Sequence, residues 1–450
     1  MGRVLLSLCF AALAAGTGLP GAAMAQDPGE PSPPAPTTIT MTPGQLFDFA
    51  DQARDRGDYA TAEASYRALA SNPDIDIRSE ARFRLGMMLA DNQRRYADAA
   101  LEFRKILDEK PKAGRVRLEL ARMHAMLGDP GGAARELRAA EAAGLPPEVR
   151  QTVRFYAGAF EAQKPIGFSL GMALAPDTNI NRATKSDTLG TVIGDFTLDD
   201  NAKAKSGIGL SLRGQAYYRT AIDKRARVLV QISGQGDLYR QSEFNDAIAV
   251  IQVGPEYQSG KDRIYVGGTV SWRWYGGSPF SKTMGVSSSV RHPMGRQGQL
   301  QIEGGLVQDD NRLNDLQDST IASFSVGYDR AFTPTFGGGV SLAGSRTKAK
   351  DPGYSMSSGG PNAYLFREFG PITAIINLGY NHLEADQRLF LYPRRRFDNR
   401  YSVGLGVTLR NFRFGNFAPL AKLQIERNVL TIEIYDYTRF SGEFGVTAAF

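Results

Sequence analysis

From residue 165 onward, apolar and polar residues alternate with a period of two along most of the chain. Late in the chain, Tyr401, Val403 and Leu405 alternate with a serine and two glycines. Because successive side chains point to opposite sides of a strand, each strand has one apolar face and one polar face. A closed barrel with lipid outside and water inside produces this pattern. The alternation over residues 165–450 therefore predicts a membrane-spanning β-barrel.

The alternation falls into fourteen segments. The predicted strands are 166–176, 207–220, 225–240, 246–259, 262–275, 282–293, 297–308, 318–331, 335–348, 357–369, 371–383, 399–411, 416–429 and 436–450. Short connections, as at Asp223-Lys224, alternate with long ones, as at residues 184–206. Outer-membrane barrels have short periplasmic turns and longer external loops, and an even strand number returns both barrel ends to the periplasm. The pattern favours a 14-stranded antiparallel barrel.

Residues 44–164 change to a helical period, and their pattern repeats three times. The shared anchors are small and aromatic residues: Tyr59, Ala62 and Tyr66, then Tyr96, Ala99 and Phe103, then Gly128 and Ala133. Tyr66 and Phe103 are 37 residues apart, which is close to the tetratricopeptide period of about 34. Small residues let paired helices approach closely, and the aromatic residue fills the space between repeats. We expect a tetratricopeptide solenoid with a capping helix at residues 147–163.

Two interpretations of this α-helical segment stay open. The repeats form a groove that holds a partner protein in the periplasm, or they serve only as a spacer. His124 falls at a helix-packing position, which favours a core or rim residue over a ligand. Residues 40–164 hold 20 basic and 19 acidic side chains, so they carry no basic face for nucleic acid.

The N-terminus is typical of an exported protein of a Gram-negative cell. Arg3 precedes an apolar stretch, and Ala23-Met24-Ala25 has the form of a cleavage site. This pattern predicts a signal peptide at residues 1–25. Residues 26–43 contain six prolines among small polar residues, which favours an extended linker. The single cysteine, Cys9, lies within the predicted signal peptide, so the mature chain is expected to contain no disulfide.

The alternation continues to the last residue of the chain. The residues on its apolar side are Phe440, Phe444, Val446, Ala448 and the terminal Phe450. They resemble the C-terminal strand signature by which the barrel-assembly machinery recognises its clients. We expect that machinery, together with outer-membrane lipid and lipopolysaccharide, among the partners of this chain.

No arrangement of residues in the sequence predicts catalysis. The three histidines, His124, His292 and His382, lie in different elements without the spacing of metal ligands. There is no nucleophile-elbow motif and no phosphate-binding glycine loop before a helix. The expectation is therefore a protein that is not an enzyme, without cofactor or metal.

A basic cluster precedes the twelfth predicted strand. It consists of Arg394, Arg395, Arg396 and Asp398 around Phe397. These side chains either line the lumen or anchor an external loop through ion pairs to carboxylates such as Glu384 and Asp386. The alternative is an interfacial cluster that faces lipopolysaccharide or water, and the spacing alone does not separate the two.

Three motifs resemble the Slam family of surface lipoprotein assembly modulators, whose barrel is the translocon of type XI secretion systems. The first motif runs from Ala173 to Ala183 and contains Pro176, Asp177, Asn179, Asn181 and Arg182. The second motif is Pro393–Asp398. The third is Glu426–Asn428 together with Tyr435-Asp436-Tyr437-Thr438-Arg439. The order of signal peptide, tetratricopeptide repeats and 14-stranded barrel matches as well. The resemblance implies export of client lipoproteins, or of soluble haem- or metal-acquisition proteins, to the cell surface.

From the residues alone, two functions stay open. One is a translocon whose tetratricopeptide groove captures the client, and the other is a passive porin-like channel with a periplasmic protein-binding domain. A porin needs no such groove, which favours export. The Pro176–Ala183 segment either gates the pore or begins the first external loop, since its Pro-Asp and Asn residues also favour turns.

Overall fold

The structure, a computed structural model, describes residues 41–143, 166–223, 225–295, 297–409, 412 and 417–448. Residues 43–450 form one compact unit. Its described N-terminal part consists of six helices: α1(Pro43–Asp55), α2(Tyr59–Leu69), α3(Ile75–Asp91), α4(Tyr96–Glu109), α5(Gly114–Leu127) and α6(Pro130–Ala142). The predicted signal peptide, most of the linker and the capping helix lie outside the described residues.

Helices α1 to α5 pack around one apolar core, and α6 packs on α5 through a second, small cluster around Ala140. Tyr66, Ala62, Ala99 and Phe103 are fully buried in the first core, whereas Tyr59 and Tyr96 are partly buried at its edge. Gly128 ends α5 in the left-handed conformation, at φ 82°, and Ala133 is buried on α6. The aromatic and small anchors of the repeat are thus the residues that bring neighbouring helices together.

Gly86 of α3 lies directly against the aromatic ring of Phe103 of α4. A Cβ atom placed there would lie 2.7 Å from the Phe103 ring of α4. Alanine normally stabilises a helix interior relative to glycine by about 1 kcal/mol. We expect Gly86→Ala instead to destabilise the helices by about 1–3 kcal/mol, because the ring has to move.

Hydrogen exchange of α3 and α4 in the full chain measures this effect. Gly44→Ala is the matched control, because nothing lies within 4 Å of a Cβ atom at that helical position. Exchange in Gly86→Ala as slow as in the control would contradict the predicted crowding.

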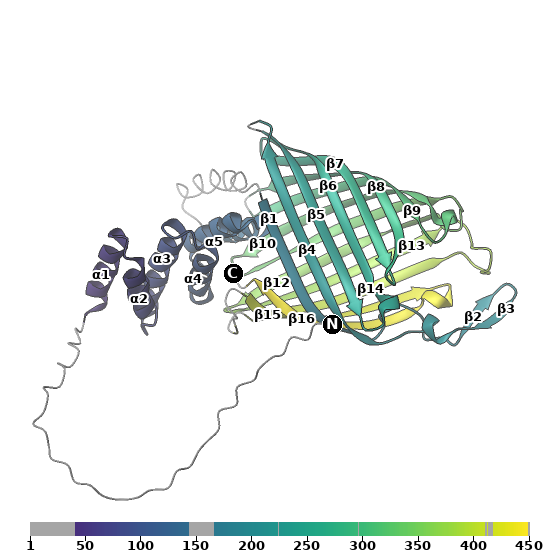
Figure 1. Cartoon of the computed structure of the whole chain (residues 1–450), viewed down its shortest axis with the longest axis horizontal. Coiled ribbons are helices and arrows are strands. Elements are labelled where there is room, and N and C mark those ends of the chain that lie inside the picture. The colour runs from purple at the N-terminus through teal and green to yellow at the C-terminus, as the bar shows by residue number, and fades with distance from the viewer. Residues whose placement is uncertain are drawn as a thin grey trace, which may run out of the picture. The chain divides into compact units, whose positions relative to one another are not determined.

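The chain then forms a closed antiparallel barrel of fourteen strands, in which β1 pairs with both β4 and β16 (Figure 1). The barrel strands are β1(Ile166–Asp177), β4(Gly207–Ala221), β5(Ala226–Tyr239), β6(Asp246–Ser259), β7(Asp262–Tyr275), β8(Ser278–Met294), β9(Gly298–Asn311), β10(Ser319–Thr333), β11(Phe336–Ala349), β12(Met356–Phe369), β13(Ile372–Ala385), β14(Phe397–Leu409), β15(Phe417–Leu430) and β16(Tyr437–Ala448). The predicted fold class, a helical repeat domain followed by a 14-stranded barrel, is confirmed.

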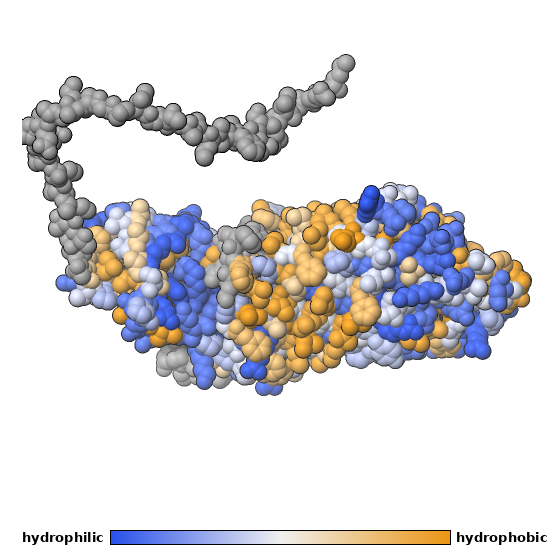
Figure 2. All heavy atoms as spheres, turned by 90° about the horizontal axis from the view of Figure 1, so that it is seen from below, coloured by the Kyte–Doolittle hydropathy of each residue, from blue (hydrophilic) through white to orange (hydrophobic). Residues whose placement is uncertain are grey.

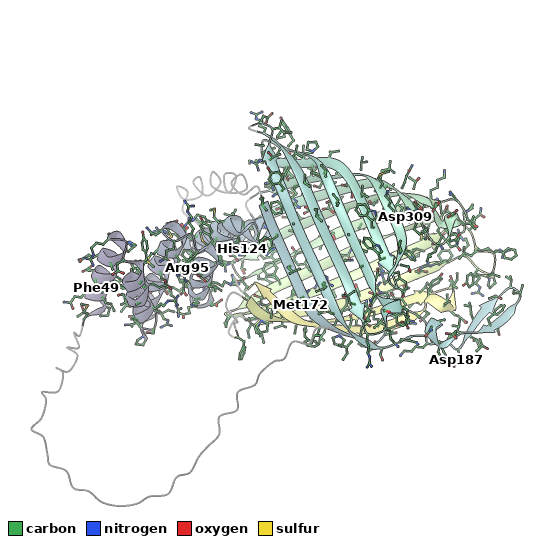
Figure 3. All side chains as sticks on the ribbon, in the orientation of Figure 1. Phe49, Arg95, His124, Met172, Asp187 and Asp309 are labelled. Carbon is green, nitrogen blue, oxygen red and sulfur yellow. The ribbon has the colours of Figure 1, made fainter. Side chains whose placement is uncertain are left out.

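The alternation of the sequence becomes the two faces of the barrel wall. On β14, Tyr401, Val403 and Leu405 are half exposed on the outside, and Met172 of β1 lies on the outside as well (Figure 3). Hydrophobic side chains gather over the barrel wall (Figure 2). Such an apolar belt is what lipid requires of a closed barrel. Among the described helices, none is long and apolar enough to cross a membrane.

Most strand ends lie within three residues of the prediction, and two details differ from it more strongly. Strand β8 begins at Ser278 instead of residue 282, because Gly276 and Gly277 both adopt positive φ and make a two-residue hairpin turn. The predicted loop 184–206 contains a small hairpin of β2(Thr188–Thr191) and β3(Gly194–Thr197), which is separate from the barrel sheet (Figure 1).

Candidate functional site: the barrel lumen and its two ends

The barrel has a polar interior. Arg213 of β4 and Lys422 of β15 both pair with Glu443 of β16, at N–O distances of 2.5 and 2.9 Å. Half of the Arg213 side chain is exposed although it points inward, so water reaches the interior. A polar interior solvates a polypeptide or an ion, which an apolar core would not do.

A cavity of about 460 Å³ lies on another part of the inner wall. Its lining includes Arg219, Glu256, Arg263, Tyr265, Ser287 and Glu303. Arg219 and Glu256 form an ion pair of 3.4 Å there. The lining mixes both charge signs with hydroxyl groups, which fits a hydrated passage better than a site for one small ligand. Among the described residues, no group of His, Cys, Asp and Glu is arranged to hold a metal ion.

One end of the barrel, which we call the long-loop end, carries the family motifs. Asp177 closes β1 there, and its carboxylate accepts hydrogen bonds from Arg439 of β16 at 2.5 and 2.7 Å. The other carboxylate oxygen of Asp177 accepts from the backbone N–H of Asn179 at 2.8 Å. Only 1% of the Asp177 side chain is exposed. Two motifs that are 262 residues apart in sequence thus meet at one buried ion pair.

The two asparagines of the motif organise the loop that follows β1. Asn179 is fully buried, and its side chain bonds to both the N–H and the C=O of Ala183, at 3.0 and 2.8 Å. Asn181 donates to the C=O of Lys203 at 2.7 Å and accepts from the N–H of Lys205 at 3.1 Å. These bonds join the two ends of the loop, which favours an anchoring role for the motif. Neighbouring Arg182 adopts a positive φ of 48°.

The basic cluster lies in the connection between β13 and β14. Arg395 forms a 2.9 Å ion pair with Glu384, and Arg396 pairs with the buried Asp398, while Arg394 is exposed. Asp386 pairs with Arg346 of β11 at 2.5 Å. The geometry is that of a loop anchored by ion pairs, which is one of the two alternatives that the sequence left open.

The last motif surrounds the connection between β15 and β16. Tyr435 ends a short 3-10 helix, and the Arg396 guanidinium lies 4.3 Å from the centre of its ring. Asp436 pairs with Arg427, and Tyr437 donates its hydroxyl to Glu426 within the wall. On β16 itself, Phe444 and Val446 are exposed on the apolar side and Ala448 pairs with β15, while Phe450 lies outside the described residues.

Removing Arg439 tests how strongly the first motif is held. Arg439→Ala leaves the buried Asp177 carboxylate without its cation, and we expect the barrel to lose about 3–5 kcal/mol. The measurement is the temperature at which the folded form converts to the unfolded form on a denaturing gel. Arg346→Ala is the matched control, because its ion pair with Asp386 is exposed and contributes less than about 1 kcal/mol. Equal losses in the two variants would contradict this assignment.

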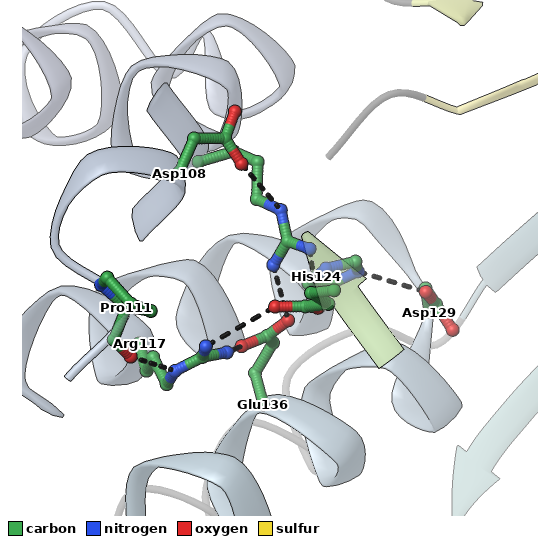
Figure 4. A network of polar contacts seen from close by, with 8 residues as sticks. Asp108, Pro111, Arg117, His124, Asp129 and Glu136 are labelled. Carbon is green, nitrogen blue, oxygen red and sulfur yellow. Dashed lines mark hydrogen bonds and ion pairs between the residues drawn. The ribbon is translucent and has the colours of Figure 1, made fainter. Parts of the chain in front are cut away.

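The other end of the barrel, which we call the short-turn end, meets the helices. Arg104 of α4 donates to Glu368 of β12 at 2.5 Å and to Glu136 of α6 at 3.2 Å (Figure 4). Arg117 of α5 donates to the same two carboxylates, at 3.4 and 2.8 Å. Asp108 lies 3.8 Å from Arg104. We call Arg104, Arg117, Glu136 and Glu368 the mouth cluster.

The mouth cluster is buried. Arg117 exposes 1% of its side chain, and none of the other three exposes more than 13%. Burial lowers the pKa of Arg104, but the carboxylates of Glu368 and Glu136 outweigh it, so the net pKa is raised and the guanidinium stays charged. Sequence reasoning did not find this cluster, because Arg104 and Glu368 are 264 residues apart and no motif links them.

The first helices of the three repeats share a face. Asp51 of α1 pairs with Arg84 of α3 at 2.5 Å, and Asp91 of α3 pairs with Arg122 of α5 at 2.8 Å. Arg84 also covers the ring of Phe47 at 4.7 Å. We call these residues, with Met87 beside Arg122, the first-helix face. It combines charged groups with apolar ones, as surfaces that bind proteins do.

His124 of α5 is 4% exposed and contacts Asp129, directly before α6, at 2.9 Å. Burial raises the pKa of Asp129, but its bonds to His124 and to the N–H of Gly132 outweigh burial and lower the pKa to about 2. Asp129 thus stabilises the start of α6, and His124 is a packed structural residue.

Fold and site define the class: a β-barrel that spans an outer membrane and carries an N-terminal helical repeat domain. Residues 167–444 match the family model described as surface lipoprotein assembly modifier, which covers the barrel from its first strand to its last. Residues 47–113 and 89–148 match the tetratricopeptide repeat. The chain belongs to the surface lipoprotein assembly modifier family.

A surface lipoprotein assembly modifier of Moraxella catarrhalis is 27% identical over 190 residues, or 42% of this chain and 36% of the relative. The matched part thus spans about a third of the length of that relative. Among solved structures, the trimer form of OmpT of Vibrio cholerae is 9% identical at a TM-score of 0.35, over 63% of this chain and 99% of that one. Salmonella typhi OmpF in complex with daunomycin is 10% identical at a TM-score of 0.33, over 63% and 98%. These two likenesses are too weak to carry an argument.

Proposed function

We propose that this protein exports client lipoproteins, or soluble haem- or metal-acquisition proteins, from the periplasm to the cell surface. One observation carries the proposal: a barrel with a polar interior matches the lipoprotein-assembly family along its whole length and meets a helical repeat domain at one end. Family and fold point to an assembly or channel protein that is not an enzyme.

The proposed orientation places the helices and the short-turn end in the periplasm. The barrel begins at β1 and ends at β16, so both of its ends lie on one side of the membrane. A signal peptide at residues 1–25 and a linker at 26–43 would deliver residues 44–164 to the periplasm and residues 165–450 to the outer membrane. The barrel-assembly machinery would recognise β16, and lipid and lipopolysaccharide would surround the apolar belt.

In the proposed mechanism, the first-helix face binds the client and the barrel provides the passage. Ion pairs such as Asp51–Arg84 offer charges of both signs, and Phe47 and Met87 offer apolar contact. A polypeptide that leaves this face at the barrel mouth meets the polar inner wall, where Arg213 and Glu443 replace part of its hydration. No covalent chemistry is needed for this transfer.

Reconstitution tests the proposal. The purified full chain is inserted into liposomes, and a lipidated candidate client is presented with a periplasmic carrier on the side of the helices. We expect protease-protected client on the opposite side in at least about tenfold excess over liposomes that contain a porin. Equal amounts with both proteins would overturn the export proposal.

Conductance in planar bilayers distinguishes the export proposal from the alternative function. A passive channel with a periplasmic protein-binding domain gives a large and steady current in the absence of any client. The export proposal predicts a conductance that is small at rest. A steady porin-like current from the native chain would favour the alternative.

A further inference from the structure

We propose that the helical domain closes the short-turn mouth of the barrel and that the mouth cluster is a releasable latch. The closed mouth is inferred from contacts within this chain. The role of its release, which is to admit a client, rests on the proposed export function. Three features support this proposal. They are the positions at which the helices contact the barrel, the pairing of the charges, and the ion pairs that remain after the helices leave.

The helices contact three well-separated points of the ring. Tyr217 of β4 donates its hydroxyl to the C=O of Gly128 at 3.1 Å, Arg138 of α6 donates to Gln299 of β9 at 3.0 Å, and Glu368 lies on β12. Around the fourteen strands, β4, β9 and β12 are five, three and six strands apart. A body that touches points so distributed around a ring has to lie across the opening.

The three contacts named above are polar, although apolar residues of α6 and of the rim, such as Ala139 and Ala331, also lie close together. Glu368 is the only barrel residue of the mouth cluster, and it bridges two guanidiniums from different helices. The Arg138 pKa is lowered by burial against the rim although Asp329 lies near, and its hydrogen bond to the barrel is to the neutral Gln299. Permanent interfaces are mostly apolar, whereas polar and ion-paired ones suit parts that separate.

Release leaves neither side with an unpaired buried charge. Glu136 holds Arg104 with one carboxylate oxygen and Arg117 with the other, so both guanidiniums keep a partner when Glu368 departs. Glu368 itself lies two residues before the turn at Gly370 and gains water when the helices leave. Undocking therefore avoids the large cost of stranding a buried ion.

Two variants of the full chain test the latch. Glu368→Gln keeps the shape and removes the charge, and Glu368→Lys opposes both arginines. Asp262→Asn and Asp262→Lys are the matched controls, because Asp262 begins β7 at the same end of the barrel and pairs with His292 of the barrel itself. Retention of the folded, heat-modifiable form verifies the barrel in all four variants.

The first readout is docking. Arg138→Cys with Gln299→Cys is introduced into each variant and treated with a short bifunctional thiol reagent. We expect efficient cross-linking in the native background and in both controls, and a yield at least roughly fivefold lower in Glu368→Lys, with Glu368→Gln between them. An unchanged yield in Glu368→Lys would overturn the latch.

The second readout is closure. In planar bilayers without client, the open probability of Glu368→Lys should exceed that of the native chain at least about tenfold. A lower cross-link yield without this gain in conductance would overturn closure of the mouth. Both readouts use the chain alone, so their failure is distinguishable from failure of client export.

Discussion

Reversing two charges on the first-helix face, by Arg84→Glu together with Arg122→Glu, is expected to reduce display of the client at the cell surface at least about tenfold. Each arginine bridges the first helices of neighbouring repeats and is partly exposed beside an apolar residue. Like charges brought together in a binding surface cost several kcal/mol, enough to abolish a transient complex. The measurement is protease shaving of the client on intact cells.

A matched control separates binding from folding. Arg67→Glu with Arg95→Glu also reverses two charges and also breaks ion pairs, in this case those to Glu63 of α2. We expect the control to retain display. Equal loss in both double variants would mean that the effect comes from instability of the helices and that the first-helix face has no special role.

A charge in the apolar belt is expected to have the other large effect. Leu378 points outward at the middle of β13 and exposes about half of its side chain to lipid. Leu378→Arg should cost about 2–4 kcal/mol at this depth and strongly reduce the amount of folded barrel in the outer membrane. Asn377→Arg, one residue earlier, places the same charge on the inner wall.

The measurement is the heat-modifiable, folded fraction of each of the two variants in isolated outer membranes. The inward Asn377→Arg variant should assemble close to native levels, because water and polar groups surround it. Loss of assembly in the Asn377→Arg variant alone would show that the two faces of β13 are assigned the wrong way round.

The barrel could be predicted from the sequence because its pattern is local. The predicted strands 246–259 and 262–275 coincide with β6 and β7, since the period of two is read within a single strand. The start of β8 was missed by four residues although Gly276-Gly277 is a recognisable hairpin turn. The β2–β3 hairpin has only four residues in each strand, too few for a periodic signal.

The contacts that connect distant parts of the chain could not be predicted in the same way. Asp177 and Arg439 belong to motifs that the sequence singled out, but nothing in their spacing pairs them. Arg104, Arg117 and Glu368 belong to no motif, and on a helix or strand each looks like an ordinary surface charge. Only the closure of the barrel and the packing of the repeats bring them together.

The most direct test of the central claim is surface exposure of a lipoprotein in cells with and without this protein. Intact cells that express each candidate client are treated with protease, and the remaining client is quantified against a periplasmic marker. Export predicts that at least one client is cleaved in cells that contain the protein and is protected in cells that lack it. Unchanged exposure of every candidate client would contradict the account.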